Sequence, residues 1–312
     1  MSERVSLRFR PWHLAWLLML VATGLAASVY LWRIRSASGM AQLVARLPRG
    51  ELAVAHIDLR ALRSAGLLRL VARPDGAQEP EYLEFVRQTG FDYARDLDAV
   101  LVAFGGEETF ALLVGRFAWG RLIAFVDSRG GDCYNGFCRL PSGRPNRWIS
   151  FFAVTPSIMG LAVSRDSWAA SALLDERDPA PLGNPPPQPL WLTFSGGALK
   201  RAAWLPAGTR AFISPVSDAE RVTVALGASG SGYEAVLEVR CRTPEEAVRI
   251  ARQLTEITET LNRMVRLENK EPNPRDLSGV LTAGVFSSRD SRVEGRWPVP
   301  AEFLQALAEG SE

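Results

Sequence analysis

The chain has 312 residues, of which 47% are hydrophobic and 22% are charged, a composition typical of globular rather than disordered proteins. Its 36 basic and 34 acidic residues leave a net charge of +2, so the sequence lacks the concentrated positive charge that nucleic-acid binding needs. We therefore expect no nucleic acid among its partners.

A hydrophobic segment near the N-terminus predicts a transmembrane helix. Residues 14–32 carry no charged side chain, and at the helical rise they would span about 28 Å, close to the thickness of a bilayer core. Trp12, Trp16, Tyr30 and Trp32 lie at its two ends, where aromatic rings favour the headgroup region. We expect these residues to anchor the protein in a lipid bilayer.

The order of segments predicts how this helix is oriented. A short basic tail, residues 1–13, precedes it, and such a tail usually stays in the cytoplasm. We therefore predict a single-pass protein of the cytoplasmic (inner) membrane, with a juxtamembrane linker at 33–46 and an extracytoplasmic C-terminal region. A cleaved signal peptide is the alternative, because Gly24-Leu25-Ala26 is a small-x-small site.

Beyond residue 46, short strand patterns alternate with helical patterns. In the first half, residues 47–174, strands are expected at 52–57, 99–104, 109–115, 149–154 and 160–164. Helices are expected after Asp58, at 82–88, at 119–126 and at 168–174. The strands fall into pairs around short turns, which is typical of antiparallel hairpins.

Two cysteines in the first half predict a disulfide. Cys133 and Cys138 flank a four-residue segment centred on Asn135-Gly136, and Asn-Gly favours a two-residue type I′ hairpin turn. Such a turn places the two cysteines directly opposite one another, at a spacing that a disulfide accepts. We predict this bond and an oxidising, extracytoplasmic compartment; two reduced cysteines are the alternative. No metal site is expected, because too few soft ligands accompany the pair.

The second half begins after a proline-rich stretch. Residues 175–189 contain six prolines and predict an extended linker. From 190 to 307 we expect strands at 191–194, 221–226, 233–240, 280–286 and 291–296, and helices at 195–203, from 243 onward and at 300–307. The long helix has the clearest start, because Thr243, Pro244 and Glu246 form a capping signature.

Both halves therefore read as βα–ββα–ββα, which predicts an α+β fold. Antiparallel hairpins with helices between them are typical of this class. We expect an N-terminal transmembrane helix followed by two similar halves, each with its own antiparallel sheet in ferredoxin-like layers, and a short tail at 308–312. The proline-rich stretch would separate the halves.

Side chains suited to catalysis are sparse. His56 is the one histidine beyond the hydrophobic segment, and no motif places a nucleophile near it, so a structural role is the simpler interpretation. Asp92, Asp96 and Asp98 could together hold Ca²⁺ or flank a substrate, but they also fit a helix stop at Gly90 followed by a capped turn. We find no cofactor motif and expect no cofactor.

Several short motifs resemble those of a bacterial protein group. They are Leu47-Pro48, Asp58-Leu59 with Leu62, the TGFDYARDLD segment at 89–98, and Gly115-Arg116-Phe117. Together they are similar to a group of uncharacterised, singly membrane-anchored proteins of acidobacterial type. The resemblance covers mainly residues 47–175. It implies a similar architecture and anchoring, and it brings no activity, ligand or catalytic residue.

Three hypotheses for the function follow. The leading one is a membrane-anchored, extracytoplasmic interaction or envelope-accessory protein without catalytic activity, with an envelope protein as partner. The second is a carrier for a lipid or small ligand, held in a pocket between sheet and helices. The third is an enzyme that uses Asp92, Asp96 and Asp98. A deep apolar cavity would indicate the carrier, and carboxylates converging in a cleft would indicate the enzyme.

Overall fold

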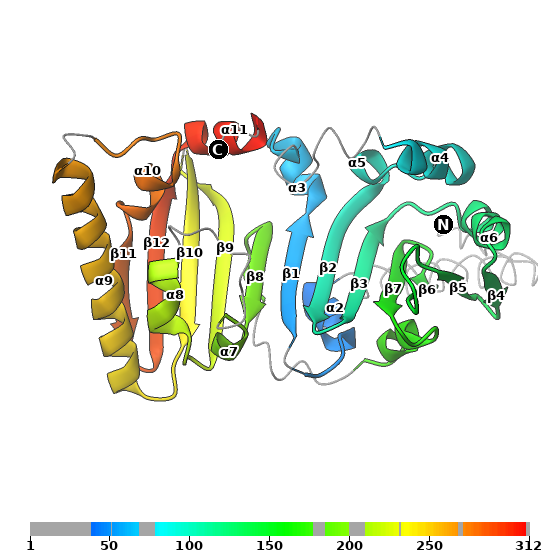
Figure 1. The fold of residues 1–312 in the computed structure, drawn as a ribbon, viewed down its shortest axis with the longest axis horizontal. Coiled ribbons are helices and arrows are strands. Elements are labelled where there is room, and N and C mark those ends of the chain that lie inside the picture. The colour runs from blue at the N-terminus through cyan, green and yellow to red at the C-terminus, as the bar shows by residue number, and fades with distance from the viewer. Residues whose placement is uncertain are drawn as a thin grey trace, which may run out of the picture.

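A computed structural model describes residues 39–50, 52–68, 79–176, 185–199, 210–230, 232–267 and 271–309. Within these residues, one twelve-stranded antiparallel sheet has the order β11-β12-β10-β9-β8-β1-β2-β3-β7-β6-β5-β4 (Figure 1). The strands are β1 (Ala53–Asp58), β2 (Leu97–Gly105), β3 (Glu108–Gly115), β4 (Asp132–Tyr134), β5 (Phe137–Pro141), β6 (Trp148–Thr155), β7 (Ile158–Ser164), β8 (Leu190–Phe194), β9 (Arg221–Ser229), β10 (Gly232–Arg240), β11 (Val285–Arg289) and β12 (Arg292–Val299). The helices are α2 (Met40–Arg46), α3 (Leu59–Ser64), α4 (Pro80–Thr89), α5 (Tyr93–Asp96), α6 (Trp119–Ser128), the 3-10 helix η3 (Ala169–Leu173), α7 (Gly196–Leu199), α8 (Arg210–Val216), α9 (Pro244–Leu267), α10 (Leu277–Leu281) and α11 (Ala301–Glu309).

The prediction of two ferredoxin-like halves with separate sheets is wrong. The first strands of the two halves, β1 and β8, pair with one another, with Val54 opposite Thr193 and Ile57 opposite Leu190. This pair joins the halves into one sheet, and the strand order is mirrored about it. Alternation of apolar residues predicts that a segment is a strand but does not say which strand it pairs with, so the sequence could not place this junction.

The predicted membrane anchor is also corrected. Among the residues that the structure describes, no helix is both long enough and apolar enough to cross a bilayer. The predicted span at 14–32, with its flanking aromatic residues, lies outside the described residues. The prediction of a single-pass inner-membrane protein with an extracytoplasmic domain is therefore withdrawn.

Two further segments differ from the prediction. Residues 40–46, assigned to a linker, form α2, and its Leu43 and Val44 are buried in the core. Val280, expected at the start of a strand, belongs instead to the short helix α10. The side chain of Asp276 caps this helix by accepting the backbone N–H of Ser278 at 2.7 Å. The cap at Asp276 thus favours a helix at residues for which the apolar pattern had predicted a strand.

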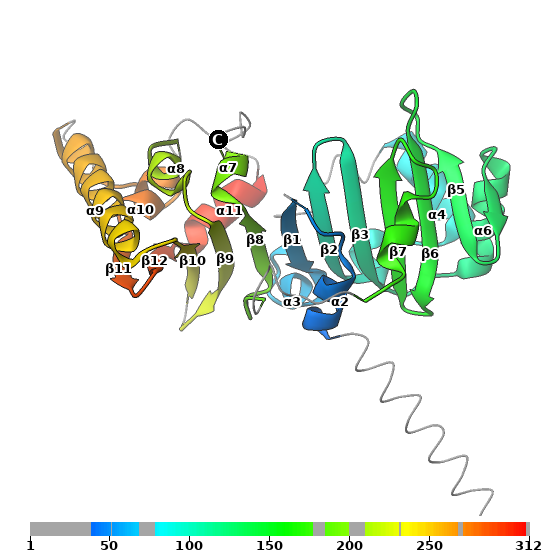
Figure 2. The ribbon, with the colours of Figure 1, turned by 90° about the horizontal axis from the view of Figure 1, so that it is seen from below.

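Helices cover the two faces of the sheet unevenly. On one, the α9 face, helices α8, α9 and α10 cover the C-terminal end and α6 covers the end formed by β5 and β6. On the other, the α2 face, α2 and η3 cover the middle of the sheet. Figure 2 shows α8 and α2 on opposite sides. Because side chains alternate along a strand, β8 directs Leu192 to the α9 face and Trp191 to the α2 face.

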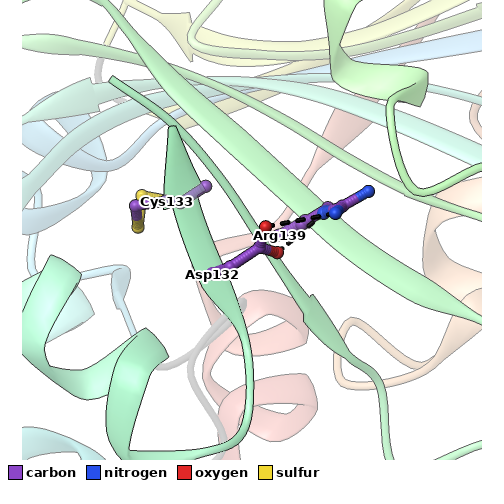
Figure 3. Close-up of a disulfide and its surroundings, with 4 residues drawn as sticks. Asp132, Cys133 and Arg139 are labelled. Atoms are coloured by element: carbon purple, nitrogen blue, oxygen red, sulfur yellow. Dashed lines mark hydrogen bonds and ion pairs between the residues drawn. A yellow bond between two sulfur atoms is a disulfide. The ribbon is translucent and has the colours of Figure 1, made fainter. Parts of the chain in front are cut away.

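The hairpin of β4 and β5 contains the predicted disulfide (Figure 3). Cys133 lies directly opposite Cys138 in the strand register and is bonded to it. Asn135 and Gly136 form the turn with φ of 50° and 79°, the positive values that a type I′ turn needs. Because disulfides persist where thiols are not kept reduced, the bond indicates an oxidising environment.

Loss of the disulfide should weaken the fold without abolishing it. The bonded cysteines are only five positions apart, and the chain-entropy model for so short a loop gives roughly 2 kcal/mol. Arg139 also holds the hairpin, because its guanidinium binds Asp132 across the strands at 2.7 and 3.1 Å (Figure 3). Urea unfolding of the Cys133→Ser/Cys138→Ser variant should show this loss with a single transition. Two free thiols in protein prepared without reductant, detected by alkylation and mass spectrometry, would contradict the pairing.

Candidate ligand-binding site

His56, the lone histidine candidate, occupies a core position. Its side chain is buried in β1, and its ring lies against that of Trp191 with centroids 5.5 Å apart. Burial lowers the pKa of the imidazole below its usual value, and the nearby charge of Asp58 opposes this only in part. Its neighbours across the strands are Leu101 and Trp191, neither of which is a nucleophile. This setting is that of a packed histidine.

Two of the three candidate aspartates are occupied by local contacts. Asp92 caps α5 by accepting the backbone N–H of Ala94 at 3.0 Å, and the hydroxyl of Tyr82 donates to it at 3.0 Å. Asp98 forms an ion pair with Arg60 at 2.5 Å. In the described part of the chain, no group of histidine, cysteine, aspartate and glutamate could hold a metal ion. The carboxylates therefore serve as a cap and an ion-pair partner.

Asp96 is the buried member of the three. It accepts the backbone N–H of Asp92 at 3.0 Å, and its oxygens lie 2.8 Å from Arg95 and 3.1 Å from Arg116. The hydrogen bonds from Arg95, helped by the Asp92 N–H and by Arg116, lower the pKa of Asp96 to about 2 despite its burial. Asp96 is therefore ionised at neutral pH and ties α5 to the residue after β3.

Replacing Asp96 by asparagine should cost about 2 kcal/mol of stability at neutral pH. The folded pKa of about 2 lies below the usual value of 3.8, so the stabilisation is full above about pH 4 and is lost as the pH falls toward 2. Urea unfolding at several pH values measures this. The exposed Asp127→Asn variant is the control and should behave as wild type. An Asp96→Asn variant as stable as wild type at pH 7 would contradict this role.

An apolar pocket lies on the α9 face, between α8, α10 and the sheet. Its volume is about 420 Å³. The lining residues are all apolar or aromatic: Leu190, Trp191, Leu192, Phe194, Phe212, Ile213, Val216, Val222, Val224, Ala225, Leu226, Ala235, Leu237, Val280, Leu281 and Trp297. Because the described residues place no charged or hydroxyl side chain in its walls, the pocket is suited to binding an apolar molecule.

Neighbouring strands form the floor of the pocket with apolar side chains. Across β8 and β9, Leu192 lies opposite Val224 and Phe194 lies opposite Val222, so that both strands present apolar side chains together. Helix α8 has seven residues, which at the helical rise is only about 10 Å of cover. Val224, which lines the pocket, keeps 37% of its surface exposed. An apolar ligand could remove this surface from water.

Trp297, one of the lining residues, carries a buried polar atom. The indole nitrogen of Trp297 is buried and has no hydrogen-bond partner among the described residues. The rings of Phe286 and Phe212 pack edge-on against this tryptophan, with centroids 5.1 and 6.1 Å away. An indole N–H can only donate, so an acceptor on a ligand would suit it.

No family model matches the chain, and no curated protein sequence matches it either. Among solved structures, crystal form I of TP0453 aligns with a TM-score of 0.50 at 13% identity, covering 88% of this chain and 98% of that one. Crystal form III of TP0453 aligns with a TM-score of 0.46 at 10% identity, covering 86% and 97%. At this identity, the first alignment shows a similar fold alone.

Proposed function

We propose that the protein is a binding or carrier domain for a small apolar ligand. The observation that carries this proposal is the pocket of about 420 Å³, whose described lining residues are all apolar or aromatic. Sites for small molecules usually have volumes of roughly 300–1,000 Å³ and mainly apolar linings. The occupied aspartates and the packed His56 offer the enzyme hypothesis no comparable support.

The expected ligand is an alkyl chain or a compact ring system with one hydrogen-bond acceptor. Each methylene group moved from water into such a pocket gains about 0.8 kcal/mol, so eight carbons gain roughly 6 kcal/mol before the cost of immobilisation. The acceptor would take the N–H of Trp297, which is costly to bury unpaired. A gain of roughly 6 kcal/mol corresponds to a dissociation constant of about 40 μM before that cost, so we expect affinity on the order of 100 μM for an eight-carbon ligand.

A fluorescence titration tests the proposal. N-phenyl-1-naphthylamine, a neutral apolar fluorophore, should bind saturably at one site and be displaced by straight-chain alcohols. The alcohols should gain affinity by about fourfold per methylene until the pocket is full. Absence of saturable binding, or displacement that is independent of chain length, would overturn the proposal.

A non-enzymatic interaction domain is the second candidate. It is favoured by apolar side chains near the end of α9, where Met264 and Leu267 are 57% and 82% exposed. A partner protein could bury them. A pull-down with wild-type protein and with the Met264→Ser/Leu267→Ser variant tests this, because a specific partner should be lost from the variant. Equal recovery with both proteins would count against this surface.

A further inference from the structure

A second pocket, of about 350 Å³, lies on the α2 face of the same strands. It lies on the opposite face of the sheet from the apolar pocket, because successive residues of a strand point to opposite faces, and Trp191 is the residue that the two linings share. Its walls include Thr193 of β8, Arg221 and Thr223 of β9, and Arg240 of β10. Its character is therefore polar and basic, in contrast to the apolar pocket.

Arginines from three neighbouring strands meet in one row at this pocket. Arg240 lies directly opposite Arg221 on one side and directly opposite Arg292 on the other, and all three line the pocket. Like charges placed directly across a sheet repel one another. Glu238, which also lines the pocket, lies 3.8 Å from Arg292. The side chains of Arg221 and Arg240 have no ion pair among the described residues, and the charge of Glu220 acts on Arg221 more weakly than burial and Arg240 do, so the row keeps a net positive charge.

Several hydrogen-bond donors at the pocket lack acceptors. Nε of Arg221 and the indole nitrogen of Trp191 are buried and have no partner within the described ranges. The hydroxyl of Thr223 donates to that of Thr193 at 2.9 Å, which leaves the Thr193 hydroxyl hydrogen free to donate. Burial, together with the charge of Arg240, lowers the pKa of Arg221 from its usual value. Unpaired buried donors are costly, and an acceptor would satisfy them.

We propose that this pocket binds the oxyanion of a small organic molecule, a carboxylate or a phosphate monoester, between Arg221 and Arg240. The planar guanidinium group presents two parallel donors that match the oxygens of either group. Pro185, Pro186 and Trp191 form apolar parts of the wall, against which the carbon skeleton of the anion packs. This site is independent of the apolar ligand proposed above.

Calorimetry and thermal unfolding of the full chain with inorganic phosphate and with succinate test the site. At about 10 mM, at least one of the two should bind at one site and raise the Tm by a few degrees above a sodium chloride control of equal ionic strength. Phosphate binding alone identifies a phosphate ester as the ligand class, and succinate binding alone identifies a carboxylate. Failure of both anions to exceed the chloride control would overturn the proposal.

Two variants separate a binding role from a structural one. Arg240→Gln should weaken anion binding by about tenfold or more and, because it relieves repulsion within the row, should raise the Tm of the anion-free protein. Arg289→Gln is the matched control, because Arg289 lies opposite Arg292 at the exposed end of the row and outside the pocket. It should leave binding within about twofold of wild type. Equal weakening by both variants, or an anion response unchanged in Arg240→Gln, would overturn the proposal.

Discussion

Replacing Ala235 by tryptophan should lower the affinity for N-phenyl-1-naphthylamine by roughly a hundredfold or more, because the new side chain occupies the space that a ligand needs. Ala235 lies on β10, with Leu226 opposite it on β9 and Trp297 opposite it on β12, and all three line the apolar pocket. The fold should survive, because the indole ring enters an existing cavity, at a cost of about 1–3 kcal/mol.

A tryptophan placed outside the pocket is the matched control for this experiment. Ala228 is exposed near the end of β9 and does not line the pocket, so Ala228→Trp should keep the affinity within about twofold of wild type. Circular dichroism of both variants checks that they remain folded. A folded Ala235→Trp variant that binds the fluorophore as tightly as wild type would show that the ligand lies elsewhere.

Replacing Trp191 by alanine should destabilise the protein by about 3–5 kcal/mol, the usual cost of removing a large buried aromatic side chain. Trp191 is 2% exposed and lies directly opposite His56 in the strand pair that joins the two halves of the sheet. Urea unfolding followed by far-ultraviolet circular dichroism should show one cooperative transition, shifted to a lower urea concentration.

Trp168 provides the comparison for this prediction. It is 41% exposed and lies against the guanidinium of Arg139, 4.7 Å from the ring centroid, so Trp168→Ala should cost only about 1 kcal/mol.

Because β1 and β8 join the two halves into one sheet, the number of unfolding transitions shows whether the halves unfold together. If Trp191→Ala unfolded in two steps, one of them at the wild-type midpoint, the halves would unfold independently and the β1–β8 junction would not couple them.

Local signals in the sequence predicted many of the elements. The long helix α9 begins at Pro244 as expected, and the hydroxyl of Thr243 accepts the backbone N–H of Glu246 at 3.2 Å. Gly90 ends α4 with φ of 72°, a conformation that glycine adopts without strain. The disulfide hairpin was likewise predictable, because Asn135-Gly136 fixes its register locally. Each of these features depends on residues close together in the chain.

Features that depend on pairing between distant strands were not predictable. The contact of His56 with Trp191 exists because β1 pairs with β8, and neither strand's pattern specifies the other. The apolar pocket brings Leu192 of β8 to the same site as Trp297 of β12, and its size depends on how little of this surface α8 covers. The row of arginines likewise requires the register of β9, β10 and β12.

The most direct test of the proposed binding function is a crystal structure of the protein soaked with 8-bromo-1-octanol. Bromine can be located without bias from its anomalous scattering. We expect its peak in the apolar pocket, among the side chains that line it. A peak at another site, or a pocket closed by its own side chains and empty of bromine, would contradict the proposal that this pocket binds an apolar ligand.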